Sequence, residues 1–321
     1  MKIVLVVLLF CLLISTANGQ NLLKILLNDT PPNIDGVLSE NEWRNATKTE
    51  LGFQKEPQEN DKPTEKTEVY LAFDKENLYV AFHAFDSNPS AIRAPISKRD
   101  AVSQDDFVSI WLDTYDDRRR AYIFRFNPLG VQEDGIFTPA ETDNLSWDGI
   151  LESKGNITPD GYIVEIKIPF KTLRYQINKE KTWGLHLFRW IARKAERSTW
   201  AKTSLANANL FSQMGKLEGI DDIYSGRTLD IIPTVTLSNT GERELQNAVP
   251  VLNTVNRVDA GLTVNYSITP NLTLSATVNP DFSQVENDVP QVSVNQRFPL
   301  FFPERRPFFL EGAEVFRGVY S

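Results

Sequence analysis

The amino-acid sequence predicts an all-β protein: an immunoglobulin-like or jelly-roll-like β-sandwich followed by the first strands of a membrane β-barrel. Two observations carry this prediction. Short apolar runs separated by Gly, Pro and Asn clusters fill the first two thirds of the chain, as expected for a sandwich. In the last third, apolar and polar residues alternate over 258–268 and 272–279. Alternation with a period of two residues places the apolar and the polar side chains on opposite faces of a strand.

The N-terminal residues 1–19 are typical of a secretory signal peptide. Lys2 supplies a positive charge, Ile3–Ile14 is an apolar run, and Ala17 and Gly19 are small residues ahead of cleavage before Gln20. The run is shorter than the roughly 18 residues of a spanning helix. We therefore expect an exported protein without a helical membrane anchor.

The cysteine content and the net charge narrow the cellular location and the classes of ligand. Cys11 is the only cysteine and lies in the signal segment, so the mature chain has no disulfide, thiolate nucleophile or cysteine metal ligand. An exported protein without disulfides suits a bacterial envelope. The net charge of −8 becomes −9 once Lys2 is removed. An acidic chain is a poor candidate for binding nucleic acid or anionic lipid heads.

Composition divides the mature chain into two domains. All six tryptophans precede residue 201, whereas the final third is rich in Thr, Asn, Val and Leu. We place the boundary near Ile223–Gly226, which gives a sandwich domain over 20–225 and a second domain over 226–321.

Five apolar sets on alternate residues predict the sandwich strands, and Phe170–Tyr175 is expected to form one short helical turn. The sets are Leu78, Val80, Phe82 and Ala84; Val108, Ile110 and Leu112; Tyr122, Phe124 and Phe126; Tyr162, Val164, Ile166 and Ile168; and Leu185 with Leu187.

The alternating strands of the second domain have two interpretations. Their polar faces carry Thr, Ser and Asn, which suits a strand between lipid and a watery lumen. The alternative is an ordinary soluble hairpin with one face in a core. Strands are expected at 229–237, 258–268, 272–279 and 291–296. So few strands cannot close a barrel, and an open edge in lipid is costly. We therefore expect the sequence to be a fragment.

An ordered set of motifs resembles a family 9 carbohydrate-binding module, and more narrowly the bacterial outer-membrane proteins in which such a module precedes a β-barrel of unassigned function. The motifs are Ile34–Leu38, Glu42–Trp43, Asn77–Ala81, Asp113–Asp117, Asn127–Gln132, Ile168–Phe170, Leu173–Tyr175, Trp183–Gly184, Arg189 and Trp200, and in the second domain Arg297–Gly312. The resemblance implies carbohydrate binding, an outer-membrane location and a role in polysaccharide capture or catabolism. It also implies a structural calcium ion.

Sugar binding needs flat aromatic faces and polar groups that fix hydroxyls. Candidate platforms are Trp111, Trp147, Trp190 and Trp200, of which we select Trp111, Trp147 and Trp200. Trp111 points away from the apolar set of its strand, and Trp147 lies in a polar segment read as an exposed loop. The alternative is that these tryptophans fill the sandwich core, the role that we assign to Trp43 and Trp183.

Calcium requires clustered hard oxygens. The densest carboxylates near strand ends are Asp113, Asp116, Asp117 and Asp134, with Glu133 beside the last. Their spacing matches no EF-hand loop, and the alternative is that they are solvated turn residues.

No catalytic constellation stands out in the sequence. His83 and His186, the only histidines, form no metal-binding spacing and are interpreted as structural. No pair of carboxylates is marked as a glycosidase pair, and no phosphate loop or GxSxG motif is present. The aromatic segment Phe298–Phe309 is interpreted as a barrel-mouth loop, or as a loop that contacts a partner or fills the lumen.

Three functions remain open. The first is an envelope protein whose sandwich binds a glycan and whose barrel contacts outer-membrane lipid. The second is a structural or transport component that keeps the fold without sugar binding. The third is the accessory module of a glycoside hydrolase whose catalytic part lies beyond Ser321.

Overall fold

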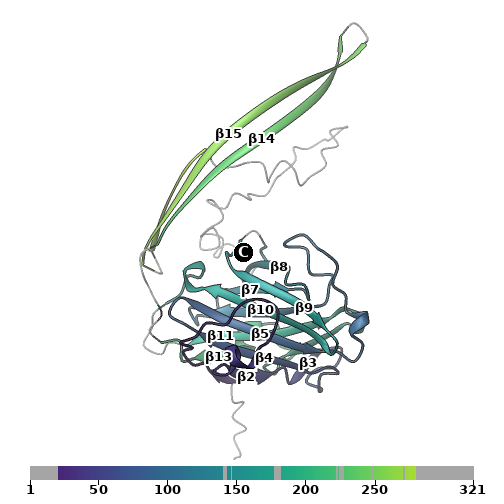
Figure 1. Cartoon of the computed structure of the whole chain (residues 1–321), viewed down its shortest axis with the longest axis vertical. Helices are drawn as coiled ribbons and strands as arrows, with labels where there is room; N and C mark the ends of the chain where they lie inside the picture. Colours follow the sequence, from purple (N-terminus) through teal and green to yellow (C-terminus); the bar gives the residue numbers. More distant parts are fainter. Residues whose placement is uncertain are drawn as a thin grey trace, which may run out of the picture.

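The structure, a computed structural model, describes residues 21–139, 143–145, 147–176, 182–221, 223, 228–246, 249–269 and 272–279. The expected signal peptide over 1–19, the strand over 291–296 and the aromatic segment Phe298–Phe309 lie outside these residues. The described chain is all-β, as predicted, and forms a sandwich of two sheets and a separate third sheet (Figure 1).

The larger sandwich sheet has eight strands in the order β1-β13-β11-β6-β7-β8, with β12 pairing to β11 and to β3. All its neighbours are antiparallel except β1 and β13. Its strands are β1 (Leu22–Lys24), β3 (Phe53–Glu56), β6 (Phe107–Asp113), β7 (Ala121–Phe126), β8 (Gln132–Phe137), β11 (Trp183–Ile191), β12 (Glu196–Thr199) and β13 (Gly215–Glu218).

The second sandwich sheet is antiparallel and has five strands in the order β2-β4-β5-β10-β9. They are β2 (Thr47–Glu50), β4 (Thr67–Phe73), β5 (Asn77–Phe85), β9 (Glu152–Thr158) and β10 (Gly161–Pro169).

Helices are short and serve as connections. In the described part of the chain they are α1 (Glu40–Trp43) and four 3₁₀ turns, η1 (Pro89–Ala91), η2 (Phe170–Thr172), η3 (Ala192–Lys194) and η4 (Leu210–Gln213). The helical turn expected after Pro169 is confirmed by η2. Within the described residues, no helix combines the length and the apolar character needed to cross a membrane.

The core lies between the two sheets, where all five predicted apolar sets meet in one cluster. Every member of these sets is at most 3% exposed. Burying one large apolar side chain contributes roughly 1.5–3 kcal/mol, so this cluster is the main stabilising contact between the sheets. Trp43 and Trp183 are also buried, as predicted.

The third sheet contains β14 (Thr228–Gln246), β15 (Val249–Thr269) and β16 (Leu272–Val278) in that order. The first two strands are much longer than the sequence indicated. The polar stretch after Leu237 resembles a strand end, but its residues pair one-to-one with β15 as far as Gln246. Pairing satisfies their backbone groups whatever their side chains, so the ladder continues. Pro233 is tolerated because β14 is an edge strand.

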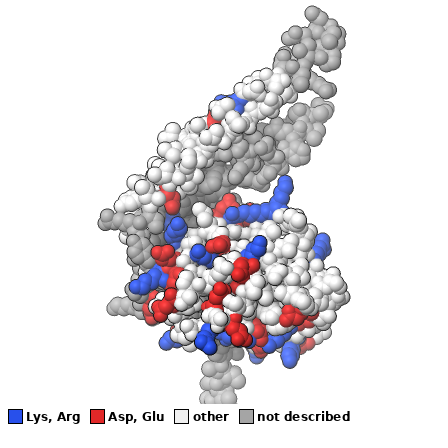
Figure 2. Space-filling view, viewed as in Figure 1, with Lys and Arg blue, Asp and Glu red and all other residues white. Residues whose placement is uncertain are grey.

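The register of this sheet produces one apolar face. Leu229, Ile231, Val235 and Leu237 on β14 oppose Tyr266, Val264, Ala260 and Val258 on β15, and Leu274, Ala276 and Val278 continue the face on β16. Most of these side chains are unusually exposed, with Leu237 at 76% and Val278 at 72%, whereas Val264 and Tyr266 are half-buried. Figure 2 shows few charges on the described part of this sheet, whereas acidic and basic side chains are interspersed over the sandwich. A continuous exposed apolar face of this kind marks a contact surface.

Candidate ligand-binding site

The outward face of the eight-stranded sheet presents a regular grid of aromatic and polar side chains. The residues of β6 and β11 that alternate with the core set point away from the sandwich core. In the ladder, Trp190 is opposite Phe107, Phe188 opposite Ser109, and His186 opposite Trp111. Strand β7 extends the middle row, because Arg125 is opposite Ser109.

A pocket of about 280 Å³ lies over this grid. The volume is near the lower end of the range typical of small-ligand sites. The residues that line it come from β3, β6, β7, β11 and β12 and from nearby loops; they are Lys55, Ser103, Phe107, Ser109, Trp111, Arg125, Asp143, Phe188, Trp190, Arg197 and Leu210.

The aromatic side chains of the pocket differ in how firmly they are held. The Trp111 ring is 8% exposed, and its centroid lies 5.4 Å from that of Phe188 and 4.8 Å from that of Phe137. Phe211 and Met214 complete this second apolar cluster. Trp190 is only half-buried and joins no core cluster among the described residues, so its ring is the more available of the two tryptophans.

The polar side of the pocket is built around a partly buried arginine. Arg125 Nη1 donates to Glu133 Oε1 (2.5 Å), and Nη2 donates to Asp143. Burial alone would lower the pKa of Arg125, but the two carboxylates outweigh it and raise the pKa. Glu133 Oε2 accepts from the backbone N–H of Val102 (3.1 Å), which fixes the pair. The guanidinium is therefore a rigid charged donor at the pocket wall.

Ser109 provides a hydroxyl in the middle of the grid. Its side chain is buried, and among the described residues its Oγ has no hydrogen-bond partner. A buried hydroxyl without a partner costs roughly 1–3 kcal/mol. Although Ser109 lines the pocket, its Oγ is closed off from solvent, so a ligand would reach it only after neighbouring side chains move.

The three tryptophans selected from the sequence fall in different places, and the structure brings only Trp111 into the pocket. Trp147 is half-buried rather than an exposed loop residue, because its ring packs on Tyr122 and Phe124 at centroid distances of 4.8 and 6.0 Å. Trp200 is 5% exposed in the main core, and its Nε1 donates to Thr49 Oγ1 (2.9 Å).

The carboxylates selected for calcium are also divided. Asp113 is held within its own turn, where its Oδ2 accepts from the N–H of Arg118 (2.9 Å). Asp116 pairs with Lys216, and Asp117 Oδ1 accepts from the N–H of Arg119 (3.0 Å). Asp134 lies on β8 and does not join them.

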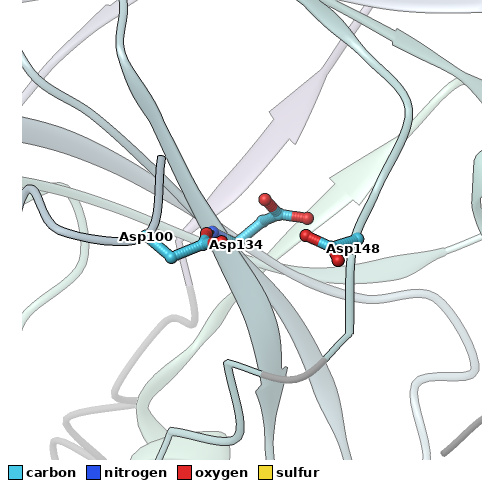
Figure 3. Close-up of side chains that lie close together, drawn as sticks. All are labelled: Asp100, Asp134 and Asp148. Carbon is cyan, nitrogen blue, oxygen red and sulfur yellow. The ribbon is translucent and has the colours of Figure 1, made fainter. Parts of the chain in front are cut away.

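Asp134 lies instead with Asp100 and Asp148, which come from two loops (Figure 3). One ligand atom from each lies within 4.8 Å of the others. Burial and the charge of Asp134 raise the pKa of Asp100 to about 6. Arg99 Nη2 lies 2.9 Å from Asp134 Oδ1 and 3.2 Å from Asp148 Oδ1. The donor atoms are of the kind that calcium prefers, but they are fewer than its usual six to eight, and Arg99 already neutralises part of their charge.

Neither histidine forms part of a catalytic arrangement among the described residues. His83 faces Asp160 (3.2 Å) and stacks on Phe85. His186 is fully buried, and burial, with a smaller effect from the charge of Lys55, lowers its pKa to about 3. His186 is therefore neutral.

Sequence reasoning considered Trp190 but did not select it, and it missed Phe107, Phe188, Arg125 and Lys55. A signal was present for the aromatics. Phe107 and Trp111 on one strand, and Phe188 and Trp190 on the next, occupy the positions that alternate with the core set. Large aromatic residues on the outward face of two paired strands indicate that this face is covered, either by a second apolar cluster, as for Trp111 and Phe188, or by a ligand.

The structure is a β-sandwich module with a pocket lined by aromatic side chains on the outward face of one sheet. The family model described as carbohydrate family 9 binding domain-like matches residues 34–215, more than half of the chain. The chain therefore belongs to this family. A second model, described as a domain of unknown function (DUF5916), matches residues 233–319.

Solved structures show similar folds at low identity. A family 9 carbohydrate-binding module from Caldicellulosiruptor kristjanssonii in complex with glucose is 19% identical, with a TM-score of 0.46, covering 64% of this chain and 99% of that one. The same kind of module with cellotriose is 18% identical, with a TM-score of 0.46, covering 63% and 96%. A Bacteroides uniformis protein named for a proposed carbohydrate-binding role is 13% identical, with a TM-score of 0.50, covering 62% and 99%. Comparison with curated proteins gives no match.

Proposed function

We propose that this chain binds carbohydrate in the pocket on the outward face of its eight-stranded sheet. The observation that carries the proposal is the combination of aromatic rings with fixed polar groups. Phe107, Trp111 and Trp190 offer apolar surface for the C–H faces of a sugar ring, while the guanidinium of Arg125 offers hydrogen bonds to its hydroxyls. Carbohydrate sites need both kinds of group in one concave surface. Membership of a family named for carbohydrate binding supports the same function.

A glycan-array screen of the full chain purified in detergent, run with calcium and with chelator, tests this proposal. We expect binding to at least one defined glycan class, reduced when Trp190 is replaced. Absence of binding in both conditions by a folded sample would contradict the proposal. The protein would then be a structural or transport component that keeps the fold alone.

We also propose that the chain is exported to a bacterial outer membrane, where the module captures polysaccharide for catabolism. The predicted signal peptide over 1–19 supports export. The third sheet supports a lipid contact, because its apolar face is exposed and β14 and β15, with 19 and 21 residues, exceed the roughly 9–11 residues that cross a bilayer. The strands would form part of a barrel in the outer membrane.

Fractionation of cells that express the full chain tests the location. We expect the protein in the outer-membrane fraction and resistant to extraction with alkaline carbonate. Recovery in the soluble fraction would favour the third sheet as a contact for another protein.

For a structural calcium ion, we propose Asp100, Asp134 and Asp148 in place of the turn carboxylates. Calcium would join two loops to β8 and would compete with Arg99. We expect the Tm to rise with calcium relative to chelator, and the rise to be lost in Asp148→Asn. A Tm that does not respond to calcium would show that Arg99 alone balances these carboxylates.

A further inference from the structure

One end of the pocket carries a cation placed there by an irregularity in the sheet. Strand β3 pairs with β12 at the edge, where Arg197 is opposite Glu56 and Ser198 is opposite Gln54. Lys55 is therefore the extra residue of a β-bulge. Bulges re-aim side chains, and they are frequent beside functional sites. Here the bulge directs Lys55 into the pocket lining.

Lys55 lies near a second cation, Arg197, which is paired with a carboxylate. Arg197 Nη1 lies 3.8 Å from Glu56 Oε1, and the guanidinium lies 5.5 Å from the centroid of the Trp190 ring. Lys55 is half-buried and has no ion pair among the described residues. Burial, and then the charge of Arg197, lower its pKa. At the other end of the pocket, Arg125 is paired with two carboxylates, Glu133 and Asp143, so that end has no excess positive charge.

The pocket is thus positive at one end, within a chain whose net charge is −8. A neutral sugar would leave this charge uncompensated in a partly desolvated site. An anionic group would accept from Lys55 and Arg197 while the sugar ring lies against Trp190, and charge-assisted hydrogen bonds are about twice as strong as neutral ones. Guanidinium and ammonium groups side by side suit a carboxylate or a sulfate.

We propose that this pocket selects an acidic saccharide, whose carboxylate or sulfate group binds between Lys55 and Arg197. The inference rests on the proposed function and adds the class of sugar to it.

Isothermal titration of the full chain in detergent at pH 7 tests the inference with four probes. They are trigalacturonate, its methyl ester, a sulfated galactan trisaccharide and cellotriose. We expect trigalacturonate or the sulfated sugar to bind about tenfold more tightly than the uncharged probes. Whichever anion binds more tightly identifies the source of the charge. The preference should weaken as salt increases, because salt screens a partly exposed charge.

Lys55→Gln should weaken the binding of the acidic probe about tenfold. The affinity for the uncharged probes should not change. Lys202→Gln is the matched control. The Nζ of Lys202 lies 5.4 Å from the ring centroid of Phe53, a residue of the same strand as Lys55. Lys202 is not among the residues that line the pocket. It should change none of the affinities.

The outcomes separate the inference from the function on which it rests. Equal affinity for trigalacturonate and its methyl ester, with no advantage for the sulfated sugar, overturns the acidic preference and keeps carbohydrate binding. An equal loss for all probes in Lys55→Gln also overturns it, because Lys55 would then only shape the site. Absence of binding to every probe and to the glycan array contradicts both proposals.

Discussion

Replacing Trp190 with alanine should weaken carbohydrate binding while leaving the fold intact. The Trp190 ring is half-buried, lines the pocket and belongs to no core cluster. A sugar stacked on it would cover about 80 Å², less than half of the roughly 200 Å² of such a side chain. At about 25 cal/mol per Å², the lost contact corresponds to about 2 kcal/mol, or about 30-fold in Kd.

Isothermal titration with the best ligand of the array measures this loss, and urea unfolding of the same samples checks stability. Trp200→Phe is the control. Trp200 is buried in the core and donates to Thr49, so this variant should lose stability and keep its Kd. An unchanged Kd in a folded Trp190→Ala sample, or a large loss in Trp200→Phe, would refute the placement of the site.

Three further predictions concern stability, each measured by urea unfolding. Trp147→Ala should lower the free energy of unfolding by about 2 kcal/mol without changing the Kd, because replacing a fully buried tryptophan costs about 3–5 kcal/mol and Trp147 is only half-buried. Weaker sugar binding in this variant would show that Trp147 contacts the sugar. The pKa of His186 is about 3 in the folded state and near 6.5 in the unfolded state, so below about pH 6.5 the unfolded chain binds a proton that the folded chain does not. Stability should therefore fall as the pH drops from about 6.5 towards 3. His186→Gln should make this fall less steep, and an unchanged pH dependence would contradict the prediction. Asp86→Asn should cost about 3–5 kcal/mol, because it leaves Arg189 buried without its counter-charge and removes the pair with Arg193; a cost below 1 kcal/mol would show that the remaining hydrogen bonds suffice.

Part of the candidate site could be predicted from the sequence. The alternation around Trp111 correctly placed this residue on the face away from the core. Periodicity assigns a face to each side chain, but it does not say which loop covers that face. The sequence therefore predicts an exposed Trp147, whereas its ring packs on Tyr122 and Phe124.

Partners distant in sequence decide the rest of the site. Arg125 acquires its role from Glu133 and Asp143, and Lys55 from a register shift between two strands about 140 residues apart. Such pairings cannot be predicted from the local sequence, because strand register is set by the whole sheet.

The sequence by itself determined the all-β class, the strands of the core and the apolar face of the third sheet. These properties follow from period-two alternation, which is local and survives any arrangement of the strands. Only the tertiary structure decided that β6 and β11 are neighbours, so that their outward aromatics form one surface. It also joined Asp134 to Asp100 and Asp148 rather than to Asp113. Strand order and loop packing depend on contacts across the whole chain, and those contacts create the pocket.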